Sequence, residues 1–325
     1  MPPPSEGSRL VEASAPFPGV SVVVATRNRA DRLRRLLDGL AAQDLEEPFD
    51  VVVVDDGSTD DTAAGLAAER TFPLRSLRRE TPGGPAAARN EGWRAARGAL
   101  IAFTDDDCVP TPGWLRALVA AARADDDVVA QGPVRPDPAE AGRHGPYSRT
   151  LRVEQGNAWF PTANMLYPRI VLERLGGFDE QDFPVAGEDT DLAWRAHEDG
   201  ARLVFVPDAL VHHAVNDLGR VGKLKVAARW TDLPGLVARH PELRERANLH
   251  LRIFWKREHE LLLRTLVAVA LPRRAWPLKV ALAYPYARAL LHRGGPKHAP
   301  YWALHDAVEI LALARGSLRH RALLL

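Results

Sequence analysis

The segment "VVVVDDGSTD" at residues 51–60 carries the clearest indication of fold class in this chain. Its four valines are typical of a strand covered on both faces, as in a parallel sheet. The strand ends in Asp55 and Asp56, which places charge where burial is costly. A plain turn before a helix, with Ser58 or Asp60 as the cap, explains the polar residues that follow but does not require both aspartates. Taken alone, the segment therefore predicts a buried strand and leaves its two carboxylates to be explained.

Composition indicates an ordinary globular protein of 325 residues, with 46% hydrophobic and 26% charged residues. A single cysteine, Cys108, excludes a disulfide framework or a cysteine zinc site and fits a reducing cytoplasm. Residues 1–18 lack the apolar segment of a signal peptide, so we expect a disordered leader. The best apolar window, residues 261–272, contains an arginine and is too short to span a bilayer. These features predict a cytoplasmic location.

Charge divides the chain into two parts of opposite sign. Residues 1–217 carry 23 arginines, no lysine and 35 acidic residues, a balance of −12, whereas residues 218–325 carry 20 basic and 7 acidic residues, a balance of +13. The acidic part binds nucleic acid poorly on electrostatic grounds, so no nucleic-acid partner is expected. The basic part could face an anionic membrane or an anionic acceptor.

Short apolar runs alternate with helical patterns in the first part, which predicts a doubly wound α/β sheet. The predicted strands are 20–25, 51–54, 99–103, 128–132 and 203–206, and the predicted helices between them are 30–43, 60–70 and 83–98. Ligands of such sheets bind beyond the carboxyl ends of the strands. The first three strand ends read "ATRN", "DDGS" and "TDDD", so polar residues gather where a ligand site is expected.

From residue 218 the pattern changes to short amphipathic helices interrupted by prolines, expected at 220–240, 247–271, 276–292 and 299–315. We therefore expect a leader (1–18), an α/β domain (19–217) and a basic helical region (218–325). Tryptophans lie near arginine and lysine in this last region: Trp230, Trp255, Trp276 and Trp302. Two explanations stay open, namely peripheral contact with a membrane surface, or a helical appendage that covers the α/β domain or forms a homodimer.

The strongest local signal is "IAFTDDDCVP" at residues 101–110, where a strand ends in three carboxylates. Because side chains alternate in extended chain, Asp105 and Asp107 can point the same way and hold Mg2+ or Mn2+. A solvated acidic turn is the alternative, and it is the interpretation preferred for "DDD" at 125–127. A further acidic cluster, "GEDTDLAWR" at 187–195, opens a predicted helix, where helix-dipole complementation accounts for part of its charge.

Six segments together resemble family 2 glycosyltransferases, which are inverting, nucleotide-sugar-dependent enzymes of the GT-A fold. In chain order they are "SVVVATRNRADRL", "VVVVDDGSTDDT", "ARNEGW", "FTDDDCVP", "TANMLYPRIVLERLGGFDE" and "GEDTDLAWRAHEDGARLVFVPDALVHH". The resemblance covers roughly residues 19–215. It implies a nucleoside pocket lined by Thr26 and Asp56, with Asp55 in a supporting role and Arg89 bracing the acidic site or approaching the diphosphate. The full donor-binding set that it implies is Thr26, Asn28, Asp55, Asp56, Arg89, Asp105 and Asp106.

The resemblance also implies a metal site and a catalytic base. Asp105 and Asp107 match the family's Asp-x-Asp, in which Asp107 would ligate the metal and Asp105 would hold the metal or the ribose. His212 or His213 matches a position near the metal or the phosphates, with His212 preferred. Asp189 matches the catalytic base, with Glu188 beside it. On this interpretation the base and ribose of the nucleotide supply the partners that Asp55 and Asp56 require.

The implied reaction moves a sugar from a UDP-, GDP- or dTDP-linked donor to an acceptor hydroxyl, with Mn2+ or Mg2+. The acceptor would be a glycan, a small molecule or a lipid-linked sugar, with Trp159, Asn164 and Trp194 as candidates on the acceptor side. For Trp194, a place in the core is an equal alternative. A nucleotidyltransferase is a weaker alternative, because the first strand is followed by "ATRNRADR" and not by a glycine-rich phosphate loop. A non-catalytic nucleotide-sugar-binding protein is the other alternative, which sequence alone does not exclude.

Overall fold

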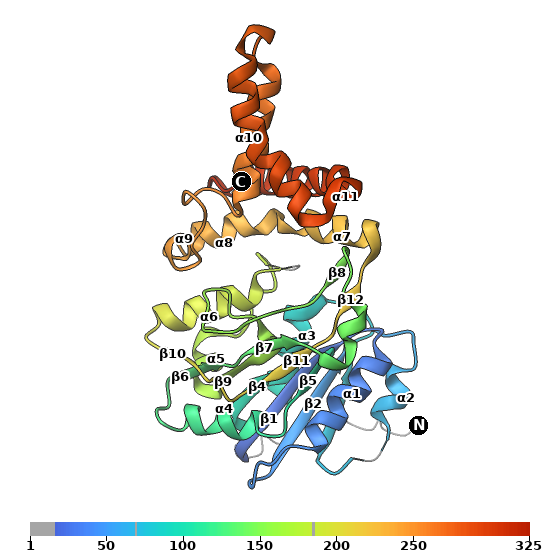
Figure 1. Ribbon diagram of the computed structural model, residues 1–325. Helices are drawn as coiled ribbons and strands as arrows, with labels where there is room; N and C mark the ends of the chain where they lie inside the picture. The colour runs from blue at the N-terminus through green and yellow to red at the C-terminus, as the bar shows by residue number, and fades with distance from the viewer. Residues whose placement is uncertain (1–16, 69, 184–185) are drawn as a thin grey trace, which may run out of the picture.

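The computed structural model describes residues 17–68, 70–183 and 186–325, and a seven-stranded sheet forms the centre of its α/β body (Figure 1). The order across the sheet is β10-β6-β9-β4-β1-β2-β3. All neighbouring pairs are parallel except those of β9, which runs antiparallel to both β4 and β6. The strands are β1 (Phe17–Thr26), β2 (Phe49–Asp55), β3 (Leu74–Arg78), β4 (Gly98–Phe103), β6 (Val128–Gln131), β9 (Met165–Pro168) and β10 (Arg202–Phe205). The predicted doubly wound, mostly parallel sheet is confirmed.

Helices cover both faces of the sheet, as the continuous valine run requires. Val51 and Val53 of β2 pack in one core with the leucines of α1, whereas Val52 and Val54 pack in a second core with the alanines of α3. The first face carries α1 (Ala30–Ala41), α2 (Thr62–Leu66) and α4 (Trp114–Ala122). The second carries α3 (Gly84–Ala95), α5 (Arg169–Leu175) and α6 (Glu188–Glu198).

Two small sheets that the sequence pattern did not predict lie above the carboxyl edge. One contains β5 (Cys108–Pro110), β11 (Val211–His213) and β7 (Val134–Pro136), and the other pairs β8 (Ser148–Arg149) with β12 (Asn216–Asp217). The 3-10 turns η1 (Pro138–Arg143) and η2 (Thr162–Asn164) lie in the connections between these strands. Strands of two or three residues are too short to show a period of two, which explains why the sequence did not predict them.

The basic region is helical from residue 219, but its helices differ from those expected. Its elements are α7 (Gly219–Ala227), η3 (Ala228–Asp232), α8 (Leu233–Arg239), α9 (Leu243–Arg246), α10 (Arg257–Ala270), η4 (Arg273–Ala275) and α11 (Trp276–His320). The predicted helix at 247–271 begins only at Arg257. The two helices predicted at 276–292 and 299–315 are a single element that bends sharply at Gly295, whose φ of 70° favours glycine.

α10 and the first part of α11 form a hairpin that projects away from the α/β body (Figure 1). The part of α11 after the bend packs against the base of this hairpin, and α11 also packs against η3 and α8. Among the described residues, no helix combines the length and apolar character that crossing a membrane demands. The predicted leader lies almost wholly outside the described residues, and β1 begins at Phe17, just inside the predicted end of that leader.

Candidate active site

Three neighbouring strands deliver polar side chains to one edge of the sheet. β4, β1 and β2 are adjacent and parallel, so Thr26, Asp55 and the run Asp105–Asp107 all emerge at their carboxyl ends. Neither Thr26 nor Asp55 exposes more than 3% of its surface. The sequence-predicted gathering of polar groups at this edge is therefore present in the structure.

Asp55 braces the turn that follows β2. Its carboxylate accepts a hydrogen bond from the Ser58 amide (2.8 Å) and forms an ion pair with Arg78 (2.7 Å). Arg78 also donates to the Ser58 carbonyl. Asn28, which has φ 54°, joins the same turn to the end of β1: its side-chain oxygen accepts from the Thr59 amide at 2.7 Å. Asp55 is therefore a structural residue of this turn, and the supporting role at a nucleoside pocket that the resemblance implies for it stays a prediction.

The environment of Asp56 differs from the prediction that a nucleotide supplies its partners. Groups of the protein itself interact with both of its carboxylate oxygens. Its two oxygens accept hydrogen bonds from the amides of Gly83 and Gly84 at the start of α3, at 2.8 and 2.9 Å, and Arg79 lies 3.0 Å away. The helix N-terminus and the arginine offset the burial of this charge. A nucleotide is therefore not required to satisfy Asp55 or Asp56, and the explanation offered from sequence was wrong on this point.

Asp106 points back into the protein. It accepts a hydrogen bond from Thr26 (2.8 Å) and pairs with Arg29 (2.9 Å), and Arg29 also pairs with Asp107 (2.8 Å). Burial raises the pKa of Asp106 to about 6, although Arg29 opposes that shift. The sequence analysis did not predict a role for Arg29. Its one clue was its position, since it is a cation three residues after the end of β1, where the polar residues gather.

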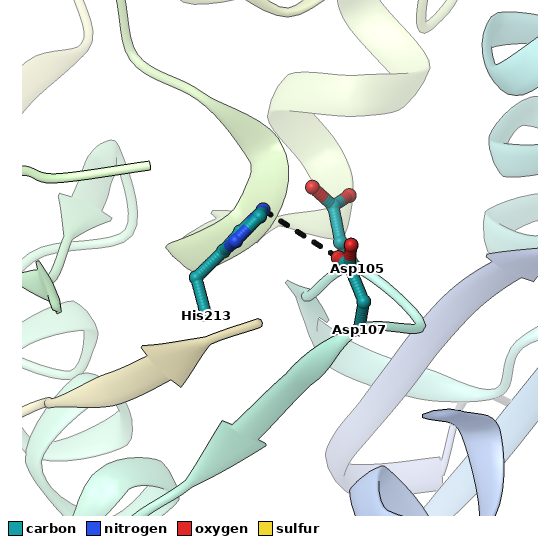
Figure 2. Close-up of side chains that lie close together, drawn as sticks. All are labelled: Asp105, Asp107 and His213. Carbon is teal, nitrogen blue, oxygen red and sulfur yellow. Dashed lines mark ion pairs between the residues drawn. The ribbon is translucent and has the colours of Figure 1, made fainter. Parts of the chain in front are cut away.

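Asp105, Asp107 and His213 converge in front of this edge (Figure 2), with one ligand atom from each lying within 4.8 Å of the others. His213 Nε2 lies 3.5 Å from Asp107 Oδ1, and Asn216 donates to the other Asp107 oxygen at 3.0 Å. Burial alone would raise the pKa of Asp107, but His213 and Arg29 hold that pKa below its ordinary value. Two carboxylates and an imidazole are a donor set that suits Mn2+ and, less closely, Mg2+.

His212, the histidine preferred from the sequence, does not join this group. β11 pairs antiparallel with β5 so that His213 lies opposite Cys108, beside Asp107. Successive side chains of a strand point to opposite faces, which turns His212 away. Its Nδ1 is buried and has no hydrogen-bond partner among the described residues. The structure therefore favours His213 as the ligand, a choice that depends on a strand pairing between residues about a hundred positions apart.

Arg149 on β8 is a second residue that sequence reasoning missed. Burial lowers the pKa of its guanidinium, nearby Arg229 lowers it further, and Asp107 and Asp105 oppose both effects. Arg149 is surface-accessible, so it can meet a ligand. Nothing in its sequence neighbourhood marked it, because it reaches the acidic site only through the β8–β12 pairing.

Arg89 links the Asp105 side of the site to the start of α6. Its guanidinium donates to Asp105 at 2.8 Å and to Glu188 at 3.0 Å, so it braces the acidic site, which is one of the two roles implied by the resemblance. Asp189 follows Glu188 in the first turn of α6. Loss of hydration and the neighbouring Glu188 raise the pKa of Asp189 to about 7, against the opposing charge of Arg89. Its Oδ1 accepts from the Thr190 amide at 2.8 Å, and in the described part of the chain no hydrogen bond reaches the other oxygen.

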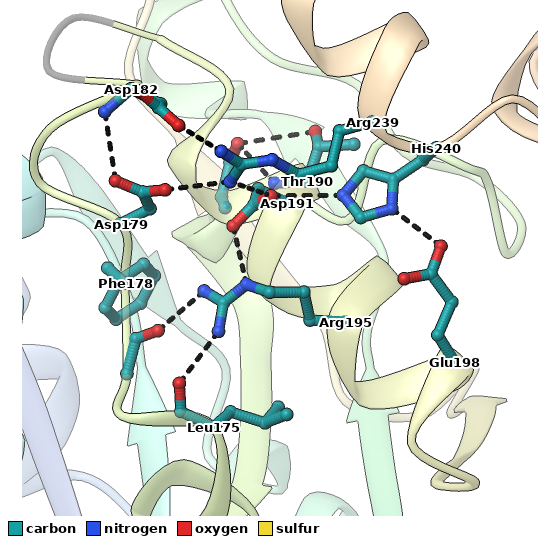
Figure 3. Close-up of polar contacts among 12 residues, drawn as sticks. Leu175, Phe178, Asp179, Asp182, Thr190, Asp191, Arg195, Glu198, Arg239 and His240 are labelled. Carbon is teal, nitrogen blue, oxygen red and sulfur yellow. Dashed lines mark hydrogen bonds and ion pairs between the residues drawn. The ribbon is translucent and has the colours of Figure 1, made fainter.

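Two residues further on, α6 is held by a buried polar network (Figure 3). Asp191 is fully buried and accepts from Arg195 (2.7 Å), Arg239 (2.9 Å) and His240 (3.0 Å). His240 is also fully buried and meets Glu198 at 2.7 Å through its other nitrogen. Since Arg239 and His240 come from the end of α8, the network joins the helix of Asp189 to the basic region.

Two of the three residues expected on the acceptor side are structural. Asn164 is fully buried, accepts from the Trp114 indole at 2.8 Å and donates to backbone carbonyls. Trp194 is 2% exposed and packs in the core between α6 and α8. Trp159 remains half-buried, with its ring centroid 5.2 Å from that of Trp255 and its carbonyl bonded to Thr190 beside Asp189.

Comparison with known proteins gives consistent results. The family model "Glycosyl transferase family group 2" matches residues 100–290, and the model "Glycosyl transferase family 2" matches residues 21–178. The pre-mycofactocin glycosyltransferase of Mycobacterium tuberculosis is 31% identical over 242 residues, which cover 69% of this chain and 48% of that protein. The validoxylamine A glucosyltransferase of Streptomyces hygroscopicus subsp. jinggangensis is 30% identical over 268 residues, covering 71% and 63%. The chain thus spans about half of the length of the first relative and less than two thirds of the length of the second.

A solved structure extends the likeness into the helical region. The mannosyltransferase PcManGT from Pyrobaculum calidifontis, in complex with GDP-Man and Mn2+, superposes with a TM-score of 0.68 at 25% identity. The superposition covers 93% of this chain and 89% of that one. Since it includes most of residues 218–325, the helical region is shared with that protein as well as the α/β body.

Proposed function

Because the chain belongs to the family 2 glycosyltransferases, we propose that it transfers a glycosyl group from a nucleotide-diphosphate sugar to an acceptor hydroxyl, with inversion at the anomeric carbon. The observation that carries the proposal is the bridge made by Arg89. It ties Asp105 of the acidic strand end to Glu188 at the start of α6, which puts a carboxylate site and a base with a raised pKa side by side.

The divalent cation would be held by Asp105, Asp107 and His213, whose donor atoms fit it. When bound, Mn2+ or Mg2+ supplies a Lewis acid that neutralises charge on the departing diphosphate. Arg29 and Asn216 orient the Asp107 carboxylate and leave the oxygen nearer His213 turned toward the site. This second layer of contacts supports the ligands as partner groups do in other metal sites.

The diphosphate would lie between the acidic strand ends and the cations of β8 and the basic region. Arg149 and Arg229 are close enough to interact electrostatically with each other, and Arg149 also interacts with Asp105 and Asp107. A dianionic ligand between these groups would relieve the repulsion of the two arginines. The nucleoside would bind beside Thr26, Asn28 and Asp56, where Asp56 offers remaining lone pairs in an orientation fixed by α3.

Asp189 would act as the general base. The Asp189 oxygen that accepts no hydrogen bond from the described residues takes the proton of the acceptor hydroxyl. The hydroxyl oxygen attacks the anomeric carbon, and the nucleoside diphosphate leaves from the opposite face. A pKa near 7 matches this task, since a base works best when its pKa is close to the working pH. Because this is a single displacement, no covalent nucleophile is needed, and the configuration inverts.

The acceptor would be a hydroxyl of a glycan, a small molecule or a lipid-linked sugar. Trp159 lies beside the start of α6 and offers an apolar ring face of the kind on which sugar rings pack. That wall continues through Trp255 to Trp230, whose centroids are 4.6 Å apart. An acceptor bound there would approach Asp189 from the side of the basic region.

Two linked measurements test the proposal. Unfolding temperatures are recorded with GDP-, UDP- and dTDP-sugars, each with Mn2+ and with EDTA, because a ligand that binds only the folded state raises the apparent stability. GDP-mannose is tried first, since the structure of the Pyrobaculum mannosyltransferase contains it. Nucleotide release is then measured with the donor that binds.

A metal-dependent rise with one nucleotide, followed by release of the nucleoside diphosphate, supports glycosyl transfer. Release of pyrophosphate would instead support a nucleotidyltransferase. Binding without release, under every acceptor and pH tried, would leave the non-catalytic alternative.

A further inference from the structure

The hairpin of α10 and the first part of α11 concentrates exposed apolar side chains at its tip. Among the described residues, fifteen large hydrophobic side chains are strongly exposed, and seven of them lie within 266–284. These seven are Leu266, Val267, Val269, Trp276, Leu278, Val280 and Tyr284, with exposures from 51% to 73%. Apolar surface gathered in this way marks an interaction site more often than single exposed residues do.

The shape of the hairpin explains why the chain does not cover these side chains itself. The two helices meet in a narrow seam near the base, formed by Leu261, Leu262 and Tyr286. Beyond that seam the hairpin projects away from the body (Figure 1). Each helix therefore buries one stripe and presents the rest of its apolar surface outward.

The charge of the same segment has one sign. Residues 261–305 contain seven lysines and arginines and not one aspartate or glutamate. At the tip, Arg273 and Arg274 are exposed, and Lys279 lies close behind them on α11. A surface that combines exposed Leu, Val and Trp with these cations is complementary to an anionic lipid headgroup layer over hydrocarbon.

We propose that the hairpin tip, residues 264–284, docks on the surface of an anionic lipid bilayer. The apolar side chains enter the boundary between headgroups and acyl chains, where an indole such as that of Trp276 is favoured. Arg273 and Arg274 contact lipid phosphates while their stems lie along apolar surface. Because these arginines are at the very tip, the docking is shallow, since carrying them into the hydrocarbon would be costly.

Charge also favours a bilayer over the other occupants of such a surface. A two-fold dimer through residues 264–284 would place the same surface on both sides and set four lysines and arginines against four, without a carboxylate in either segment. A nucleic acid would satisfy the arginines and leave the exposed valines and leucines without a partner.

The base of the hairpin is fixed firmly to the rest of the helical region. Lys256 pairs with Glu309 at 2.8 Å, and Arg293 pairs with Asp306 at 2.6 Å, with both carboxylates buried. Tyr286 donates to the same Asp306 at 3.0 Å. These contacts join the hairpin to the part of α11 beyond the Gly295 bend, so docking would hold the catalytic body at a set distance from the membrane. The inference does not depend on the proposed reaction.

Vesicle flotation tests the proposal. The full chain is mixed with phosphatidylcholine vesicles, with or without about a third of phosphatidylglycerol, at low and high NaCl. We expect binding to the anionic vesicles that weakens with salt, and binding to neutral vesicles at least tenfold weaker. The double variant Arg273→Glu with Arg274→Glu should lose most of its binding, because the affinity for anionic vesicles falls roughly fivefold for each positive charge removed. Leu266→Ser with Val269→Ser should lose binding at all salt concentrations.

Matched controls separate docking from general effects of charge and polarity. Arg34→Glu with Arg152→Glu makes the same change in net charge on exposed side chains of the α/β body, and Ile170→Ser removes an apolar group that is 57% exposed there. Both should bind like the parent chain. Vesicles with brominated acyl chains should quench the parent's fluorescence, and Trp276→Phe should bind while losing much of that quenching.

Several results would overturn the proposal. One is absence of binding to anionic vesicles at low salt, and another is equal loss of binding in the control variants. A third is that the parent chain forms a dimer in solution, that the double variant Leu266→Ser with Val269→Ser is a monomer, and that neither protein binds vesicles. This result would assign the surface to a second copy of the chain. Circular dichroism and unfolding temperature establish for each variant that the protein is folded.

Discussion

Asp189 is the residue on which the proposed chemistry depends. It lies in the first turn of α6 beside Glu188, and Arg89 reaches Glu188 from the metal-binding side. We expect Asp189→Asn to keep the metal-dependent rise in unfolding temperature caused by the donor and to lower kcat by about 10² to 10⁴-fold, the usual contribution of a general base. Steady-state nucleotide release measures kcat, and unchanged turnover would remove Asp189 from this role.

The same residue predicts a pH dependence. A base works when it is deprotonated, and the pKa of Asp189 is raised to about 7, so turnover should fall roughly tenfold per pH unit below that value and level off above it. In Asp189→Asn the residual rate should lose this acid limb. A limb that persists unchanged in the variant would assign it to another group.

The two adjacent histidines give a paired test of the metal site. His213 lies 3.5 Å from Asp107, whereas the His212 ring turns to the other side of β11. We expect His213→Ala to weaken donor binding at least tenfold in Mn2+ and to leave the much weaker binding in EDTA unchanged. His212→Ala should bind donor in Mn2+ like the parent chain. Calorimetry with both variants decides between the two, and the reverse result would restore the original preference for His212.

At the scale of elements, α3 connects the core to the site. Its N-terminus holds Asp56, its middle carries Arg89, and Gly92 lets it approach the sheet closely. A Cβ at Gly92 would lie 2.5 Å from Val23 Cγ1 and 3.2 Å from Val54 Cγ2. The helix cannot take up a methyl group there without moving away from the sheet.

Gly92→Ala should therefore lower the free energy of unfolding by about 1–3 kcal/mol, the usual cost of overpacking. Gly65→Ala in α2 is the matched control, because nothing lies within 4 Å of its Cβ. It should raise that free energy by up to about 1 kcal/mol, since alanine favours helix over glycine. Urea denaturation compares the two, and equal effects would show that the packing of α3 on the sheet is looser than described.

In the molecule as a whole, His240 joins α6 to the basic region. It is fully buried between Asp191 and Glu198 of α6, with its own backbone at the end of α8. Removing it as His240→Gln should lower the free energy of unfolding by roughly 1–3 kcal/mol, because Asp191 keeps its two arginines but loses one buried partner. Urea denaturation at several pH values measures this.

The sign of the pH dependence follows from the shift. Burial by itself would lower the pKa of His240, but hydrogen bonds to Asp191 and Glu198 outweigh it and raise the pKa above its ordinary value of 6.5. The stabilisation is therefore complete below pH 6.5 and is lost as pH rises through the pKa in the folded state. The difference between parent and variant should shrink on the alkaline side. A difference that grows with pH would mean that His240 is buried as the neutral form.

The sequence by itself determined the features that depend on local periodicity and on residue type. Unbroken valine runs require a strand covered on both faces, and their alternation with amphipathic segments predicts the mostly parallel sheet. Because parallel strands end at one edge, the carboxylates at Asp55 and Asp105 could be assigned to a single site from the order of residues alone. The six ordered motifs identified the family, whereas the role that the resemblance implies for the acidic cluster at Glu188 stays a prediction.

Only the tertiary structure decided what depends on contacts between distant parts of the chain. Antiparallel β9, the choice of His213 over His212, the partners of Asp56, and the approach of Arg29 and Arg149 all arise from pairings across tens of residues. The hairpin is another such feature. The sequence predicted helices in this region, but the projection of the hairpin depends on the bend at Gly295 and on the buried ion pair between Lys256 and Glu309. A local pattern fixes which way a side chain points from its own backbone, whereas the group that it meets is set by how the elements pack.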